Sequence, residues 1–312
     1  MAITINHQTN DLSATSGSIT IDGASAGGAS SNVGTGNFIG GTNAGTALQS
    51  GAQNNTLLGN EAGNDITTGD LNTAVGYESL SKLTTGLRNT AVGIYAGQNQ
   101  NGEDNVAIGN TAFFGSGSNI GTGSYNVAIG RMAGKVLTSG SRNILLGSDA
   151  GAAITTAWNN VVLGHSAADV LTTGSSNVVL GDNALTNGTT AGYNVIIGSA
   201  AASNGVVTGN GYNVALGYQS SRNLTSGTYN ITIGRSAGFA IETGHRNIAI
   251  GENAGLALTT GETNVLVGQN AGAAMTNQNY NVAIGSYAGA DATPNASNGS
   301  VFIGRQAGQY AD

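Results

Sequence analysis

The sequence predicts an all-β fold, a parallel β-solenoid built from 17-residue coils. Three observations predict it: a recurring five-residue block, a nearly constant spacing between its copies, and a composition of small and polar residues. The 312 residues include 52 Gly, one Pro and no Cys, and only 8% are charged. With 39% apolar residues the chain is too apolar to be disordered, and many thin layers of small side chains fit these numbers.

The repeated block has the pattern Asn–apolar–any–apolar–Gly, as in Asn72 to Gly76 and Asn126 to Gly130. Sixteen copies lie between Gly36 and Gly304, and ten of the 15 intervals between their final glycines share one length, that from Gly59 to Gly76. This fixed 17-residue period indicates stacked repeats. Asn and Gly tolerate turns, so each block predicts a short strand, and a repeat of this length is enough for two strands and two turns.

Stacking identical coils places each block Asn above the next one. Their side-chain amides can then hydrogen-bond along the stacking axis as a ladder. The predicted ladder consists of Asn55, Asn72, Asn89, Asn105, Asn126, Asn143, Asn160, Asn177, Asn194, Asn213, Asn230, Asn247, Asn264 and Asn281.

The middle residue of each block predicts an oligomer. The apolar residues on either side of it, such as Val127 and Ile129, are expected to point into the coil, since side chains alternate along a strand. A strand that is apolar on both faces is typically buried on both, so the middle residues are expected to face another chain. They include Ala128, Leu145, Val162, Val179 and Ile196. The alternative is a wide monomeric solenoid with an apolar lumen.

The pattern also resembles a known family. Asn-Val-Ala-Ile-Gly followed by Ala-Gly resembles the head repeats of trimeric autotransporter adhesins, and the stretch from Asn72 to Gly93 is similar to repeats of phage tail-fibre proteins. The resemblance covers about residues 36–308. It implies a left-handed β-roll, a side-by-side homotrimer and a role in attachment.

These features predict a structural and adhesive fibre protein of a bacteriophage-like particle, in the tail or the head and neck. No signal peptide is evident at Met1 and the following residues, so we expect synthesis in the host cytoplasm and a final place in the virion. Expected partners are further copies of the chain, other virion proteins and a host-surface glycan or protein. The alternatives are a bacterial surface adhesin head fragment and an ice-binding β-solenoid, the latter suggested by repeated Leu-Thr-Thr-Gly.

The two ends and the longer intervals depart from the repeat. Residues 1–35 form an expected N-terminal cap or attachment segment, with strands at 2–6 and 18–22, and residues 36–312 form the repeat rod. Longer intervals predict surface loops, either neutral insertions or binding loops. The candidate binding residues on them are Phe113, Phe114, Tyr125 and Tyr212.

The sequence gives no indication of catalysis. Its three histidines lack metal-ligand spacing, no phosphate-binding glycine motif is complete, and no cofactor is expected. A net charge of −7 with only nine Lys and Arg argues against a nucleic-acid partner. No apolar run approaches the roughly 20 residues of a membrane span, so no membrane insertion is expected.

Overall fold

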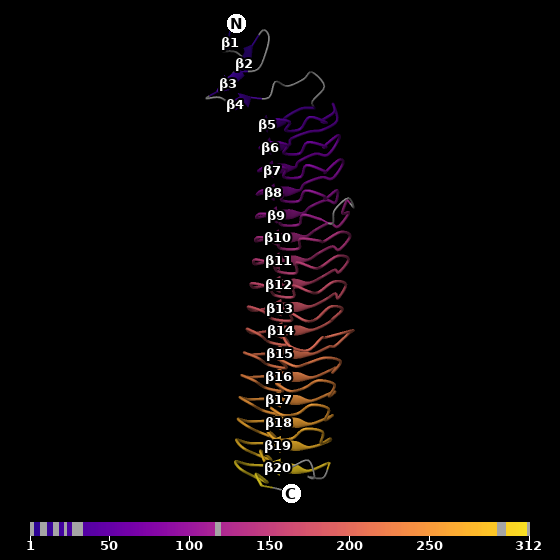
Figure 1. Cartoon of the computed structure of the whole chain (residues 1–312), viewed down its shortest axis with the longest axis vertical. Coiled ribbons are helices and arrows are strands. Elements are labelled where there is room, and N and C mark those ends of the chain that lie inside the picture. Colours follow the sequence, from indigo (N-terminus) through magenta and orange to yellow (C-terminus); the bar gives the residue numbers. More distant parts are fainter. Residues whose placement is uncertain are drawn as a thin grey trace. The chain divides into compact units, whose positions relative to one another are not determined.

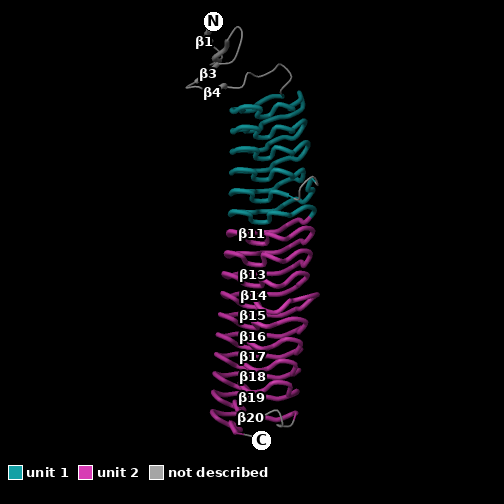
Figure 2. Tube along the Cα trace, in the orientation of Figure 1, with its two compact units in different colours: residues 1–139 teal, residues 140–312 magenta. Residues whose placement is uncertain are grey.

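The computed structural model describes residues 3–6, 11–14, 19–21, 24–26, 34–115, 120–291 and 298–310. The chain divides into two compact units, Met1–Ser139 and Gly140–Asp312 (Figure 2). The described residues of both units form strands and turns, without any helix. The predicted all-β class is confirmed.

The first unit begins with antiparallel pairs. Strand β1 (Ile3–Asn6) pairs with β2 (Asp11–Ala14), and β3 (Ile19–Ile21) pairs with β4 (Ala24–Ala26). The strands expected at 2–6 and 18–22 are therefore present. The remainder of the expected N-terminal segment lies mostly outside the described residues.

Parallel strands follow, one per repeat. In the first unit they are β5 (Phe38–Gly40), β6 (Thr56–Leu58), β7 (Thr73–Val75), β8 (Thr90–Val92), β9 (Val106–Ile108) and β10 (Val127–Ile129). In the second they are β11 (Ile144–Leu146), β12 (Val161–Leu163), β13 (Val178–Leu180), β14 (Val195–Ile197), β15 (Val214–Leu216), β16 (Ile231–Ile233), β17 (Ile248–Ile250), β18 (Val265–Val267), β19 (Val282–Ile284) and β20 (Val301–Ile303).

Each strand pairs with the strand of the following coil, as Figure 1 shows within each unit. Val161 of β12 lies opposite Val178 of β13, and Leu163 lies opposite Leu180, in each case one repeat later along the chain. Val161 N donates to Asn177 O at 2.9 Å, and Gly164 N donates to Leu146 O at 2.9 Å. The chain is therefore a parallel β-solenoid with a 17-residue coil.

The rest of each coil consists of turns rather than the second strand that the length of the repeat suggested. In the coil that begins at Asn247, Ala254 N donates to Gly251 O at 3.2 Å and Leu258 N donates to Gly255 O at 3.1 Å. The backbone φ is positive at Gly251, Asn253 and Gly255. These left-handed residues bend the chain in two consecutive turns, which leaves one short strand per coil.

Glycine is required at the end of each block because successive coils approach closely there. Gly234 has φ +130°, and a Cβ added to it would lie 2.6 Å from the carbonyl oxygen of Gly251. The same relation joins Gly251 to Gly268 in the next coil. A column of glycines thus lets the coils stack at strand spacing.

Each coil encloses a narrow core to which only a few side chains contribute. Ala249 from the strand, Ala254 from the first turn and Leu258 from the second are all 0% exposed. Where the middle strand residue is Thr232, its hydroxyl contacts Ser220 Oγ at 2.7 Å and Ser221 Oγ at 2.8 Å. Buried hydroxyls of two adjacent coils, those of Ser220 and Ser221 in one and of Thr232 in the next, therefore satisfy one another.

The prediction that the middle strand residues face another chain is wrong. Five middle strand residues were expected on that face, and all five are 0% exposed within one chain because they fill the coil: Ala128, Leu145, Val162, Val179 and Ile196. The residues on either side of them point outward instead. The reason is the alternation of side chains: the inward Asn stands two positions before the middle residue and shares its face.

Replacing a mid-solenoid glycine tests the close approach. We expect Gly234→Ala to lower the midpoint of thermal unfolding, because the backbone conformation alone costs a side chain about 1–3 kcal/mol and the carbonyl of Gly251 blocks the Cβ. Gly51→Ala is the matched control, since its Cβ would meet only Thr68 at 3.7 Å. Equal midpoints for the two variants, measured by circular dichroism, would contradict this explanation.

Candidate interaction surface

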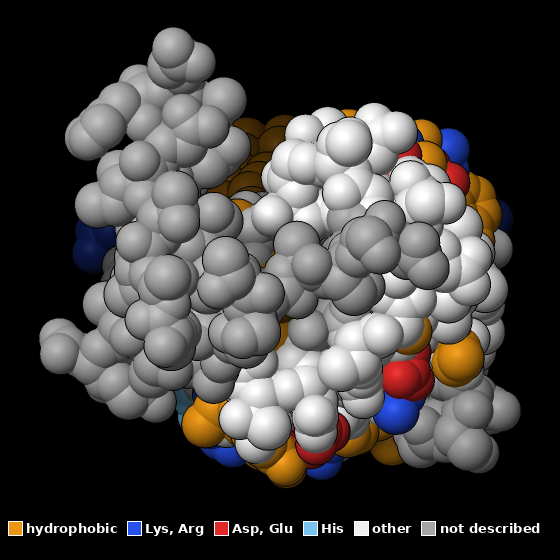
Figure 3. Space-filling model, turned by 90° about the horizontal axis from the view of Figure 1, so that it is seen from above, with side chains coloured by type: hydrophobic (Ala, Val, Ile, Leu, Met, Phe, Trp, Pro, Cys, Tyr) orange, Lys and Arg blue, Asp and Glu red, His pale blue; other side chains and the backbone are white. Residues whose placement is uncertain are grey.

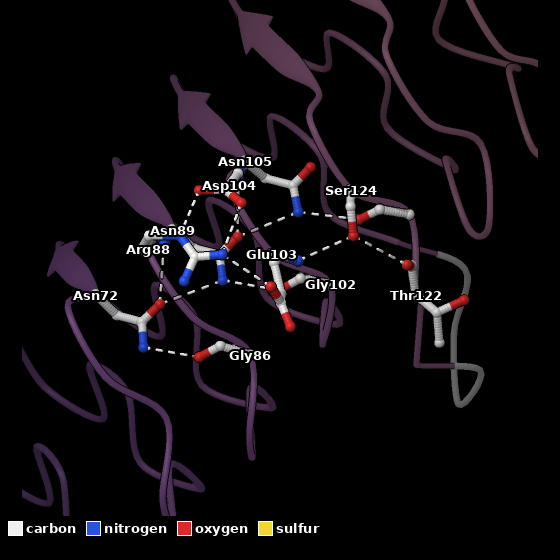
Figure 4. A network of polar contacts seen from close by, with 11 residues as sticks. Asn72, Gly86, Arg88, Asn89, Gly102, Glu103, Asp104, Asn105, Thr122 and Ser124 are labelled. Carbon is white, nitrogen blue, oxygen red and sulfur yellow. Dashed lines mark hydrogen bonds and ion pairs between the residues drawn. The ribbon is translucent and has the colours of Figure 1, made fainter.

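The asparagine ladder is present in both units. Asn89 N and Asn89 Nδ2 both donate to Asn72 Oδ1, at 2.9 and 3.2 Å, and Asn89 Nδ2 also donates to Gly102 O at 2.9 Å (Figure 4). In the second unit, Asn230 Oδ1 accepts from Asn247 N at 3.0 Å and from Asn247 Nδ2 at 3.1 Å. All 14 predicted ladder residues are buried. The ladder holds coils together and is not accessible to a ligand.

The outward face of the strands is an apolar stripe, which we define as the first and third residues of each parallel strand. In the second unit all 20 of these residues are Val, Ile or Leu, and none is buried. Leu163 is 46% exposed and Ile144 is 43% exposed. In the first unit the first position is Thr in β6, β7 and β8. An uncharged apolar surface of this extent is typical of an interaction site.

Two columns of polar and aromatic residues border the stripe. The strand-start column is the residue before each ladder Asn, and the strand-end column is the two residues after each block Gly. Arg88 of the strand-start column forms ion pairs with Glu103 at 2.9 Å and with Asp104 at 2.7 Å (Figure 4). Arg235 of the strand-end column pairs with Glu252 one coil later. In Figure 3, blue, red and orange side chains reach the surface beside one another.

Three tyrosines of the strand-start column stack along the axis. The ring centroids of Tyr193 and Tyr212 are 5.1 Å apart, and those of Tyr212 and Tyr229 are 5.2 Å apart with an interplanar angle of 6°. Arg246 continues the column, with its guanidinium carbon 5.9 Å from the Tyr229 centroid. Their ring faces therefore contact neighbouring coils, and their edges are open to solvent.

The candidate loop residues have different positions. Phe113 is 0% exposed and fills its coil, so it is not a binding residue. The Phe114 ring lies edge-on to Tyr95, with centroids 6.0 Å apart. Tyr125 is 56% exposed, and Tyr212, 44% exposed, belongs to the stack. Residues 116–119 and 292–297 of the insertions lie outside the described residues.

The repeated threonines connect coils. Thr172 Oγ1 donates to Thr189 O at 2.8 Å, and Thr259 Oγ1 donates to Thr276 O at 3.1 Å. The hydroxyls of Thr172 and Thr259, each the first Thr of its pair, are thus engaged within the chain. An ice-binding surface would need these hydroxyls to face water, so this geometry does not favour that alternative.

In the part of the chain that the structure describes, no cluster of three His, Cys, Asp or Glu side chains could hold a metal ion. His165 Nδ1 lies 3.1 Å from Asp182 Oδ1 at an exposed position. Burial raises the pKa of the Asp169 carboxyl, and the Asp149 carboxylate raises it further. Among the described residues, no helical segment has the length and apolar character of a bilayer span.

Comparisons with protein-family models, with curated proteins and with solved structures found no match to this chain.

Removing a ladder amide should destabilise the solenoid. Asn230→Ala leaves Asn247 N and Gly244 O without their partners, and each unsatisfied buried group costs about 1–3 kcal/mol. Asn230→Asp should also destabilise the solenoid, since a carboxylate cannot donate a hydrogen bond to Gly244 O. The exposed Asn60 provides the control variant Asn60→Ala. Thermal unfolding checks this, and an unchanged midpoint for Asn230→Ala would contradict the role of the ladder.

The half-buried Asp169 should make stability depend on pH. Because its folded-state pKa is raised, the charged carboxylate destabilises the fold at neutral pH, and this loss disappears as pH falls through the folded pKa. We expect Asp169→Asn to raise the unfolding midpoint at pH 7 and to give no gain at about pH 3, below the ordinary carboxyl pKa. A gain for Asp169→Asn that is equal at both pH values would refute the assignment.

Proposed function

We propose that the chain is the shaft of an attachment fibre, in which copies pack side by side through the apolar stripe. The stripe carries the proposal because it is uncharged, repeats at every coil, and consists only of Val, Ile and Leu throughout the second unit. A partner that covers it along its length needs the same period. A second copy of this chain has that period because its sequence is identical.

The gain from covering the stripe is large enough for a stable assembly. Complete burial of a Val, Leu or Ile side chain stabilises by about 1.5–3 kcal/mol, and the stripe side chains are roughly one-third exposed. The 20 side chains of the second unit would then contribute about 10–20 kcal/mol. Association costs about 4–15 kcal/mol, so the stripe can support an oligomer.

The number of copies and the setting come from the resemblance to tail-fibre and adhesin-head repeats. It favours three copies, a left-handed β-roll and a place on a phage-like virion, with host attachment or particle decoration as the role. In this proposal residues 1–35 join the fibre to other virion proteins. A bacterial surface adhesin head is the alternative within the same resemblance.

Adjacent residues of the same two strands provide the test. We expect Leu163→Asp with Leu180→Asp to give a folded monomer, because both charges lie on the outward stripe. The control, Val162→Asp with Val179→Asp, should lose the β-sheet signal, because it places charges inside the coil. Light scattering measures the mass and circular dichroism the fold. A wild-type chain that is monomeric at micromolar concentration would rule out the proposal.

A further inference from the structure

We propose that neighbouring copies pack parallel and in register, with the strand-start column of one copy against the strand-end column of the next at the same coil. This inference rests on the proposed side-by-side assembly and specifies its geometry. The two columns lie on opposite edges of the apolar stripe, one before each strand and the other after it. Both edges are therefore brought to the interface when the stripe is covered.

Symmetry determines which edges meet. In any closed ring of copies around an axis parallel to the stacking direction, the start edge of each strand faces the end edge of its neighbour at the same height. In an antiparallel pair, start edges face start edges. The two arrangements therefore juxtapose different side chains, and the charges can distinguish them.

The columns are complementary within coils. Among the described coils of the second unit, two carry a charge in both columns, and both combine opposite signs: Arg142 with Asp149, and Arg246 with Glu252. Within one chain the three-residue strand and the residues on both sides of it separate the members of such a pair, a span of up to about 20 Å. They are too far apart to pair in the same copy, and they can meet only across an interface.

A shift by one coil removes this complementarity. Moving the neighbour by one coil in one direction places Arg246 against Arg235, which have like charges. Moving it in the other direction places Arg246 against the uncharged Gln269. Like-charge contacts suppress wrong arrangements at interfaces more effectively than single exposed ion pairs stabilise right ones. The in-register arrangement is the one that the charges favour.

Aromatic residues of the two columns also favour the in-register arrangement. Tyr229 shares its coil with Arg235, and Tyr212 shares its coil with Tyr218. In the first unit, Arg88 shares its coil with Tyr95. These three in-register contacts join a cation to an aromatic ring or join two rings, and both kinds of contact are favourable.

Contacts along the axis hold these side chains in place before assembly. Arg246 lies over the Tyr229 ring, and Glu252 pairs with Arg235 of the preceding coil. An in-register contact between Arg246 of one copy and Glu252 of the next would connect these two pairs into one network. Such pre-organisation reduces the entropy lost on association.

Cysteine cross-linking tests the register directly, because the chain has no cysteine of its own. The variant Arg246→Cys with Glu252→Cys places two thiols at one coil. The controls Arg246→Cys with Arg235→Cys and Arg246→Cys with Gln269→Cys are displaced by one coil in either direction. A disulfide requires Cα atoms about 4.4–6.8 Å apart, which is shorter than the Cα separation of an Arg and a Glu that meet through the ends of their side chains. The cross-linker is therefore a short bifunctional maleimide, and a link within one copy is recognised because it leaves the mass of the monomer unchanged on a gel.

We expect the in-register variant to form covalent oligomers at least ten-fold more abundantly than either displaced variant, on denaturing gels after treatment with a short bifunctional maleimide. The largest covalent species also gives the number of copies in the ring. Preferential cross-linking of a displaced variant, or none with an oligomeric mass by light scattering, would overturn this register and leave the fibre proposal standing. A monomeric mass for the uncross-linked chain would overturn both.

Discussion

The inward asparagine ladder is the interaction on which the rest of the structure depends. Each ladder Asn bonds to the backbone and side chain of the Asn one coil away, so it must lie inside the coil. Because side chains alternate along a strand, the residue two positions later also points inward and its neighbours point outward. The ladder therefore determines both which residues form the core and which form the exposed apolar stripe.

The sequence was sufficient to predict the class of fold, the 17-residue coil and the ladder, because these depend on spacing alone. It was not sufficient for the faces of the strand. In Val161–Leu163 all three residues are apolar, so hydrophobicity does not distinguish inside from outside. The preceding Asn160 carries the missing information, since a buried amide ladder and the strand core occupy one face.

The side chains that fill the inside of each coil could not be predicted from the local sequence pattern either. Phe113 lies in the longest insertion, where exposure was expected, yet it is buried in a coil whose other core residues, Ala107 and Ala112, are small. Thr232 is tolerated in the core because Ser220 and Ser221 provide hydroxyl partners. Both cases depend on side chains that become neighbours only after the coils close and stack.

Interactions between stacked coils of one copy and interactions between neighbouring copies have different roles. The ladder and the glycine column repeat with little change from coil to coil, so they define a spacing but cannot distinguish one coil from another. An apolar stripe is equally uniform, and two such stripes could slide past one another by whole coils at little cost. Only residues that differ between coils can prevent this sliding, and the nine basic and 16 acidic residues of the chain are few and unevenly placed. Some of these charges stand at the edges of the stripe, as Arg246 and Glu252 do in one coil. In the proposed assembly, such charges would restrict a repetitive chain to one register.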